Sequence, residues 1–191
     1  MKHPSQIRVL EPFLGIIIFG VLAIYLVNVL NTNNWLWFQS KATNVRPSRI
    51  VIVDHGQQTV LTPGHDGFNS LASAASQALS KLNNSDLVNV GLSEETLSDY
   101  ETSSLVLELY FDSPVRFNTM ARTGEPTQLL IPIEGRHADG GLVFRGARGE
   151  WWYGAVRMAD PTPLYAVLAQ MGYATAALNN RSARAIQPII F

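Results

Sequence analysis

Residues Pro12 to Leu30 read PFLGIIIFGVLAIYLVNVL, and this stretch decides in which solvent the rest of the chain folds. It contains no Asp, Glu, Lys, Arg or His, and Asn28 is its only amide side chain. A hydrocarbon core about 30 Å thick needs about 20 apolar residues in a helix that rises about 1.5 Å per residue. The stretch therefore predicts a transmembrane anchor over residues 12–31, preceded by a short tail over residues 1–11.

A cleaved signal peptide and a buried core helix are the two alternatives to this anchor. A signal peptide has a shorter apolar core and a small-x-small cleavage site, whereas Asn, Thr and Trp follow this stretch. A core helix is usually amphipathic, and this segment is apolar on all sides. We therefore predict a retained signal anchor, with Trp35 and Trp37 at the membrane interface, where indole rings are half-buried.

The positive charges around the anchor favour an extracytoplasmic domain. Lys2 and Arg8 precede the apolar stretch, and Lys41, Arg46 and Arg49 follow it. The two counts are nearly balanced, but Lys2 and Arg8 lie closer to the apolar core than Arg46 and Arg49 do. By the positive-inside rule, this predicts a single-pass membrane protein with its N-terminus in the cytoplasm and its C-terminal domain outside.

The composition restricts the class of function. A formal net charge of −1 provides no basic field, so nucleic acid is not expected as a partner. Charged residues make up 15% of the chain, below the usual quarter, and this favours a domain surface partly covered by a partner. The absence of Cys excludes thiol catalysis, disulfides and cysteine-bound metal centres. We expect no cofactor, and we expect the lipid bilayer and other membrane-protein subunits as partners.

The chain after the anchor divides into a linker, one domain and a tail. Residues 32–48 are polar and predict a juxtamembrane linker, residues 49–174 an extramembrane domain, and residues 175–191 a C-terminal tail. The domain begins with the β-branched run RIVIVD, followed by the turn residues DHGQ, over residues 49–57. This order predicts a β-hairpin.

Two stretches of the domain have the apolar spacing of amphipathic helices. The first runs from Asp66 to Leu82, and Asp66 is its predicted N-cap. The second follows Asp160, a predicted cap, with Pro161 at the first helical position. Residues 93–102 between them are acidic and predict an irregular segment.

The remaining stretches predict strands. Residues 105–112 alternate apolar and polar side chains, as in a strand with one face towards solvent. Residues 127–133 contain Pro132, which cannot donate to a ladder and therefore predicts an edge or bulged strand. Residues 87–92 predict a short strand and residues 142–158 a hairpin. The whole pattern predicts an α+β fold, a mostly antiparallel sheet with two helices packed on one face.

The histidines are the residues best able to do chemistry near neutral pH. His55, His65 and Asp66 would meet if the end of the hairpin folds towards the start of the following helix, and His137 could join them in a metal or catalytic site. The alternative is that these residues have ordinary turn and cap roles. The sequence contains no G-x-S-x-G elbow, no phosphate-binding glycine loop and no H-E-x-x-H motif.

Aromatic and apolar side chains are the candidates for a partner contact. On a strand, Trp151 and Tyr153 share one face, and the residue between them faces the other way. If their face is outward, it forms a binding platform, because aromatic residues dominate interface energetics. Ile189, Ile190 and Phe191 at the C-terminus dock either on their own domain or in a partner.

These observations lead to one preferred function and two alternatives. We expect a non-catalytic accessory, assembly or regulatory subunit that is anchored by one transmembrane helix and acts through protein-protein contacts. The first alternative is a membrane-tethered enzyme or metal binder using His55, His65 and Asp66. The second is a ligand-sensing domain with a pocket between helix and sheet.

Overall fold

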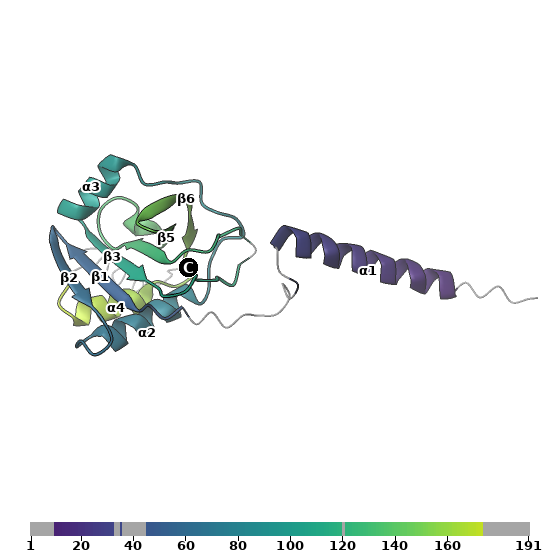
Figure 1. Ribbon diagram of the computed structural model, residues 1–191, viewed down its shortest axis with the longest axis horizontal. Coiled ribbons are helices and arrows are strands. Elements are labelled where there is room, and N and C mark those ends of the chain that lie inside the picture. Colours follow the sequence, from purple (N-terminus) through teal and green to yellow (C-terminus); the bar gives the residue numbers. More distant parts are fainter. Residues whose placement is uncertain (1–9, 33–34, 36–44, 120, 174–191) are drawn as a thin grey trace, which may run out of the picture. The chain divides into compact units, whose positions relative to one another are not determined.

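The computed structural model describes residues 10–32, 35, 45–119 and 121–173 (Figure 1). The chain divides into two units, of which the first ends at Ser40 and the second begins at Lys41. Each unit is described by itself.

The described part of the first unit consists mainly of helix α1, over Leu10–Thr32. Its stretch Pro12–Asn31 is long and apolar enough to cross a membrane, although signal sequences and the core helices of soluble proteins meet the same criteria. Most of its large apolar side chains are exposed, with fractions from 42% for Leu26 to 80% for Leu30. The prediction of a long apolar helix is therefore confirmed.

The second unit is built on a six-stranded sheet whose neighbouring strands all run antiparallel, in the order β2-β1-β3-β4-β5-β6 (Figure 1). The first and last strand pairs are hairpins with two-residue turns, His55-Gly56 and Arg148-Gly149, and all four turn residues have positive φ. Such turns match the right-handed twist of paired strands. The hairpin predicted from DHGQ is confirmed. The strand bounds are β1 Arg49–Asp54, β2 Gln57–Leu61, β3 Leu105–Tyr110, β4 Gln128–Pro132, β5 Leu142–Ala147 and β6 Glu150–Arg157.

Helices α2, Phe68–Leu79, and α4, Thr162–Gln170, lie together on one face of the sheet, as predicted (Figure 1). The main core lies between them and the sheet. Asp66 is not the N-cap of α2: Gly67 holds that position with φ 81°, and no side chain caps the helix. The Asp160 Oδ1 accepts the Thr162 N–H at 3.0 Å, as expected of a capping carboxylate, but the predicted positions are wrong by one residue, because Pro161 is the N-cap and α4 begins at Thr162.

The opposite face of the sheet differs from the prediction, which left it in solvent. A second core cluster covers this face, and its members are Val51, Val53, Tyr100, Val106, Leu130, Leu142, Phe144 and Ala155. Tyr100 belongs to helix α3, Glu94–Thr102, which lies in the stretch predicted to be irregular (Figure 1). Only Thr96 and Tyr100 of α3 are buried, so the helix has no apolar stripe from which its periodicity could be recognised.

The prediction of an edge strand at Pro132 is also wrong, because β4 lies between β3 and β5. The Ile133 N–H donates to Leu105 O on β3 at 2.9 Å, so the Pro132 nitrogen faces the β5 side. Pairing with β5 has already ended there, at Leu130↔Phe144. Pro132 therefore removes no ladder hydrogen bond.

Candidate interaction surface on the bulged strand

The last strand of the sheet, β6, is interrupted by a bulge in its aromatic stretch. Arg145 of β5 pairs with Trp152, but the preceding Phe144 pairs with Ala155, so Tyr153 and Gly154 have no partner on β5. Gly154 has φ 84°, a left-handed conformation that glycine adopts without strain. Bulges re-aim side chains and concentrate at functional positions.

A buried arginine holds this bulge in place. The Arg145 side chain is 3% exposed, and its Nη2 donates to Tyr153 O and Gly154 O, both at 3.1 Å. Its Nη1 donates to Thr123 O in the loop before β4, and its guanidinium lies 5.9 Å from the Trp152 ring centre. Arg145 thus joins β5, the bulge and the 123–124 loop.

The environment of Arg145 is unusual for a buried charge. No described carboxylate pairs with it, and its buried Nε has no hydrogen-bond partner in the described part of the chain. Burial lowers the pKa of Arg145, although arginine stays protonated in proteins at neutral pH. Three backbone carbonyls therefore replace the usual counter-ion. They offset the free-energy cost of desolvating the guanidinium only if the bulge keeps these carbonyls in place.

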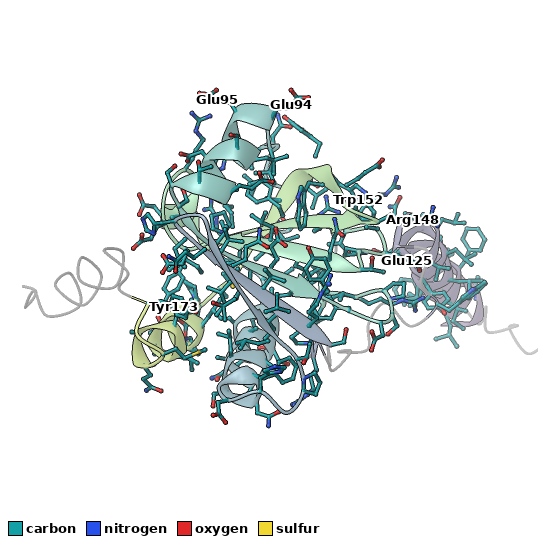
Figure 2. The ribbon with its side chains drawn as sticks, turned by 60° about the vertical axis from the view of Figure 1, so that its left-hand side comes forward. Glu94, Glu95, Glu125, Arg148, Trp152 and Tyr173 are labelled. Carbon is teal, nitrogen blue, oxygen red and sulfur yellow. The ribbon has the colours of Figure 1, made fainter. Side chains whose placement is uncertain are left out.

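The structure separates the aromatic residues that the sequence placed on one platform. Trp151 is half-buried and packs against the second core cluster. Tyr153 is 66% exposed and lies over Gly91, where a Cβ would come within 2.6 Å of its ring. Trp152, labelled in Figure 2, is half-buried. It lies over Gly124, and its ring centre is 5.9 Å from the Arg145 guanidinium.

We use the name bulge surface for Trp152 and Tyr153, the glycines they lie over, Gly124 and Gly91, and Arg145, which lies near the Trp152 ring and bonds the Tyr153 backbone. Sequence reasoning named Tyr153 but missed Arg145. The available signal was an arginine inside the apolar strand LVFRGA, followed by Gly154 within an otherwise alternating strand. Ile189, Ile190 and Phe191 lie outside the described residues, and so does Trp37.

The histidines named from the sequence do not come together. His55 lies in the β1–β2 turn, and His65 and Asp66 lie beyond the other end of β2. Five residues of strand, at about 3.3 Å each, separate the two ends. The His65 Nδ1 contacts Thr62, with Oγ1 at 2.9 Å. No group of three or more His, Asp or Glu residues in the described ranges could hold a metal ion.

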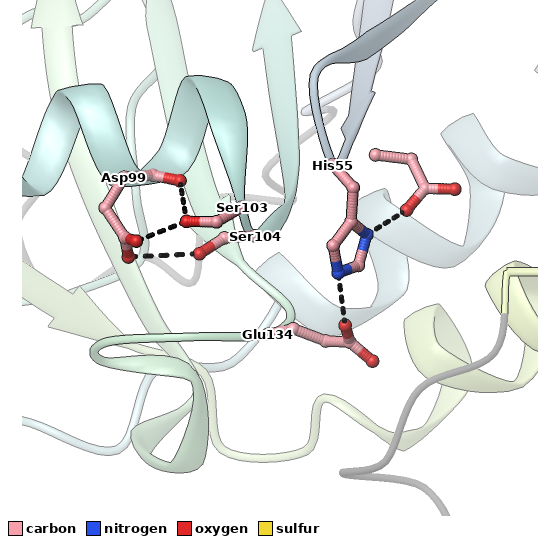
Figure 3. Close-up of polar contacts among 6 residues, drawn as sticks. His55, Asp99, Ser103, Ser104 and Glu134 are labelled. Atoms are coloured by element: carbon pink, nitrogen blue, oxygen red, sulfur yellow. Dashed lines mark hydrogen bonds and ion pairs between the residues drawn. The ribbon is translucent and has the colours of Figure 1, made fainter.

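His55 lies between two carboxylates (Figure 3). Its Nδ1 is 2.7 Å from Asp54 Oδ1 and its Nε2 is 3.8 Å from Glu134 Oε2. The nearby Ser103 and Ser104 hydroxyls donate to Asp99, not to the imidazole. This arrangement has no base-activated nucleophile and favours an ionic tie between the β1–β2 turn and the end of β4.

His137 has a different environment. It lies in the loop before β5, its Nδ1 is 2.9 Å from the Tyr100 hydroxyl, and its ring centre is 5.4 Å from that of Phe144. The Tyr100 hydroxyl donates to Arg136 O at 2.6 Å. These contacts fasten α3 to the loop before β5.

We predict that the two histidines titrate on opposite sides of their ordinary value of 6.5. The hydrogen bond to Asp54, with the charges of Asp54 and Glu134, raises the pKa of His55 despite some desolvation. Burial, and secondarily Arg136, lowers the pKa of His137. His55 therefore contributes stability that is present below pH 6.5 and lost as the pH rises through its folded pKa. His137 destabilises the fold as the pH falls below 6.5.

NMR of the full chain with labelled histidine measures both values directly. His55→Gln should remove the signal with the higher midpoint and the gain in stability at low pH. His137→Gln should remove the signal with the lower midpoint and reduce the loss of stability in acid. Midpoints in the reverse order would contradict the contacts described for the two rings.

Comparisons with protein-family models, with curated proteins and with solved structures found no match to this chain.

Proposed function

We propose that this chain is a single-pass membrane protein whose extracytoplasmic domain binds another membrane-protein subunit through the bulge surface. In this proposal it is a non-catalytic accessory, assembly or regulatory subunit. The observation that carries the proposal is the exposed ring of Tyr153, presented on a bulge that a buried arginine holds in place.

The membrane part of the proposal is supported by α1 and the residues that follow it. A helix with exposed apolar side chains along most of its length is costly in water and stable in lipid. The Tyr25 hydroxyl donates to Trp35 O at 2.7 Å, which folds the exposed indole residue back towards the end of α1. Such a position fits an interfacial aromatic anchor.

The binding part of the proposal is supported by two features of β6: a buried arginine that is costly to desolvate, and an exposed tyrosine ring on the backbone that this arginine holds. Burying Arg145 without a carboxylate is expensive, and its hydrogen bonds hold the backbone of the residues that present Tyr153. Within the described part of the second unit, Tyr153 and Val60 are the exposed large hydrophobic side chains. An exposed tyrosine whose backbone is held by Arg145, next to a tryptophan, has the composition of an interface hot spot.

Purification of the full chain from native membranes in mild detergent tests this function. We expect a stoichiometric complex with another membrane protein, resolved by size and identified by mass spectrometry. A monodisperse species containing only this chain would contradict the proposal.

A further inference from the structure

The two edges of the sheet are covered differently in the described part of the chain. The outer edge of β6 is bonded by residues 88–90: Val88 and Ala155 exchange both backbone hydrogen bonds, at 2.8 and 3.0 Å, and Gly154 N–H donates to Val90 O at 2.9 Å. The opposite edge is β2, which pairs with β1 alone among the described strands. Among the described residues, one edge of the sheet is therefore covered and the other is not.

The hydrogen-bond register identifies which groups of β2 are available. The His55 N–H donates to Ser104 O, so the odd-numbered residues of β1 bond towards β3 and the even-numbered ones towards β2. Thr59 and Leu61, the partners of Ile52 and Ile50, therefore bond to β1. The N–H and C=O groups of the alternate residues, Gln58 and Val60, point away from the sheet.

Strand β2 also lacks the features that protect an exposed edge. Its sequence QQTVL has no charge and no Pro, its pairing with β1 has no bulge, and Val60 is 49% exposed. Beyond Leu61 the edge is closed, because Thr62 N–H donates to His65 Nδ1 and His65 N–H to Thr62 O. The available edge fits a short added strand that bonds to Gln58 and Val60.

The chain itself supplies a segment of suitable length and position. Residues 174–191 follow Tyr173, which packs on the main core, and Met171 lies against Gly67 at the start of α2, six residues after Leu61. Twelve residues, 174–185, reach up to about 40 Å, more than twice the length of β2. Figure 2 shows Tyr173 on the side of the domain away from Trp152.

The sequence of the last seven residues, AIQPIIF, is consistent with an outermost strand. Ile and Phe favour strands, and a proline is tolerated where its nitrogen faces away from the sheet. Tethering to the same chain raises the effective concentration of this segment to the millimolar range. We propose that residues 185–191 bind as an added strand along the outer edge of β2 of their own chain.

Disulfide trapping in the full chain tests this inference, because the native sequence has no Cys. Val60→Cys is combined in turn with Gln187→Cys, Ile189→Cys and Ile190→Cys, and at least one pair should form an intrachain disulfide on mild oxidation. The matched control is Ser70→Cys, exposed on the first turn of α2 and three residues from Gly67. We expect at least tenfold more product with Val60→Cys. Equal yields at the two positions, or disulfides between chains, would overturn the proposal.

A second measurement needs no cysteine. Successive N–H groups of a strand point in opposite directions, so one of Ile189→Pro and Ile190→Pro, but not the other, removes a bond to β2. That variant should speed amide exchange at Gln58 and Val60 at least tenfold and leave exchange in β3 unchanged. Unchanged exchange in both variants would overturn the proposal. The inference does not rest on the proposed function, since neither measurement involves a partner.

Discussion

Replacement of Arg145 by leucine is expected to lower the free energy of unfolding by about 3 kcal/mol. The substitution leaves Thr123 O, Tyr153 O and Gly154 O without their donor, and an unsatisfied buried acceptor costs about 1–3 kcal/mol. The buried leucine offsets part of this loss. Arg145→Lys should be intermediate, because an ammonium group cannot reach all three carbonyls as the planar fork does.

Urea unfolding of the full chain, followed by tryptophan fluorescence, measures this effect. Arg157→Leu is the matched control, since Arg157 also lies on β6 but is exposed. Its effect should stay within about 0.5 kcal/mol. Equal losses in the two variants would show that Arg145 does not hold the bulge.

Gly146→Ala is expected to have a comparable or larger effect, about 3 kcal/mol. A Cβ at this position would lie 2.2 Å from Glu150 O, 2.8 Å from Gln128 Nε2 and 2.9 Å from Trp151 Cε3. The Gln128 side chain already bonds Glu150 O and Gly149 N–H, so the surrounding groups have little room to move. Overpacking of this kind costs about 1–3 kcal/mol and sometimes more.

Gly149→Ala, three residues away in the β5–β6 turn, is the control that introduces backbone strain without a steric clash. Gly149 has φ 83°, but a Cβ there would meet nothing within 4 Å. Its replacement should cost about 1–2 kcal/mol, the penalty of a left-handed conformation. The same unfolding measurement applies to both variants. A larger loss for Gly149→Ala than for Gly146→Ala would contradict the packing described around the β5–β6 hairpin.

The features that could be predicted are those carried by local patterns. The turn residues DHGQ identified the first hairpin, and apolar spacing identified α2 and α4, although Asp66 was placed wrongly as a cap. Helix α3 was missed because it buries only two residues. Ser93, which accepts the Thr96 N–H, followed by Glu94 and Glu95, was the available signal of a helix start.

The features that could not be predicted depend on tertiary context. Pro132 lies inside the sheet because the β4–β5 pairing ends before it, a register that no local pattern reveals. A shared face for Trp151 and Tyr153 was predicted from the regular alternation of side chains along a strand. The bulge at Tyr153 and Gly154 interrupts this alternation. The role of Arg145 depends on three carbonyls from two separate segments, the loop at Thr123 and the bulge at Tyr153 and Gly154, which only the folded chain brings to the β5 side chain.

The proposed contact between Tyr153 on the bulge and a partner subunit predicts a specific loss of affinity. Its most direct test is the affinity of the Tyr153→Ser chain for the partner isolated with the native protein, measured beside the Tyr153→Phe control. A hot-spot residue is worth about 2 kcal/mol or more, so Tyr153→Ser should weaken binding about 30-fold, while Tyr153→Phe keeps the ring and the affinity. Both variants should unfold like the native chain, because the side chain is exposed. Native affinity in the Tyr153→Ser chain would contradict the proposed contact.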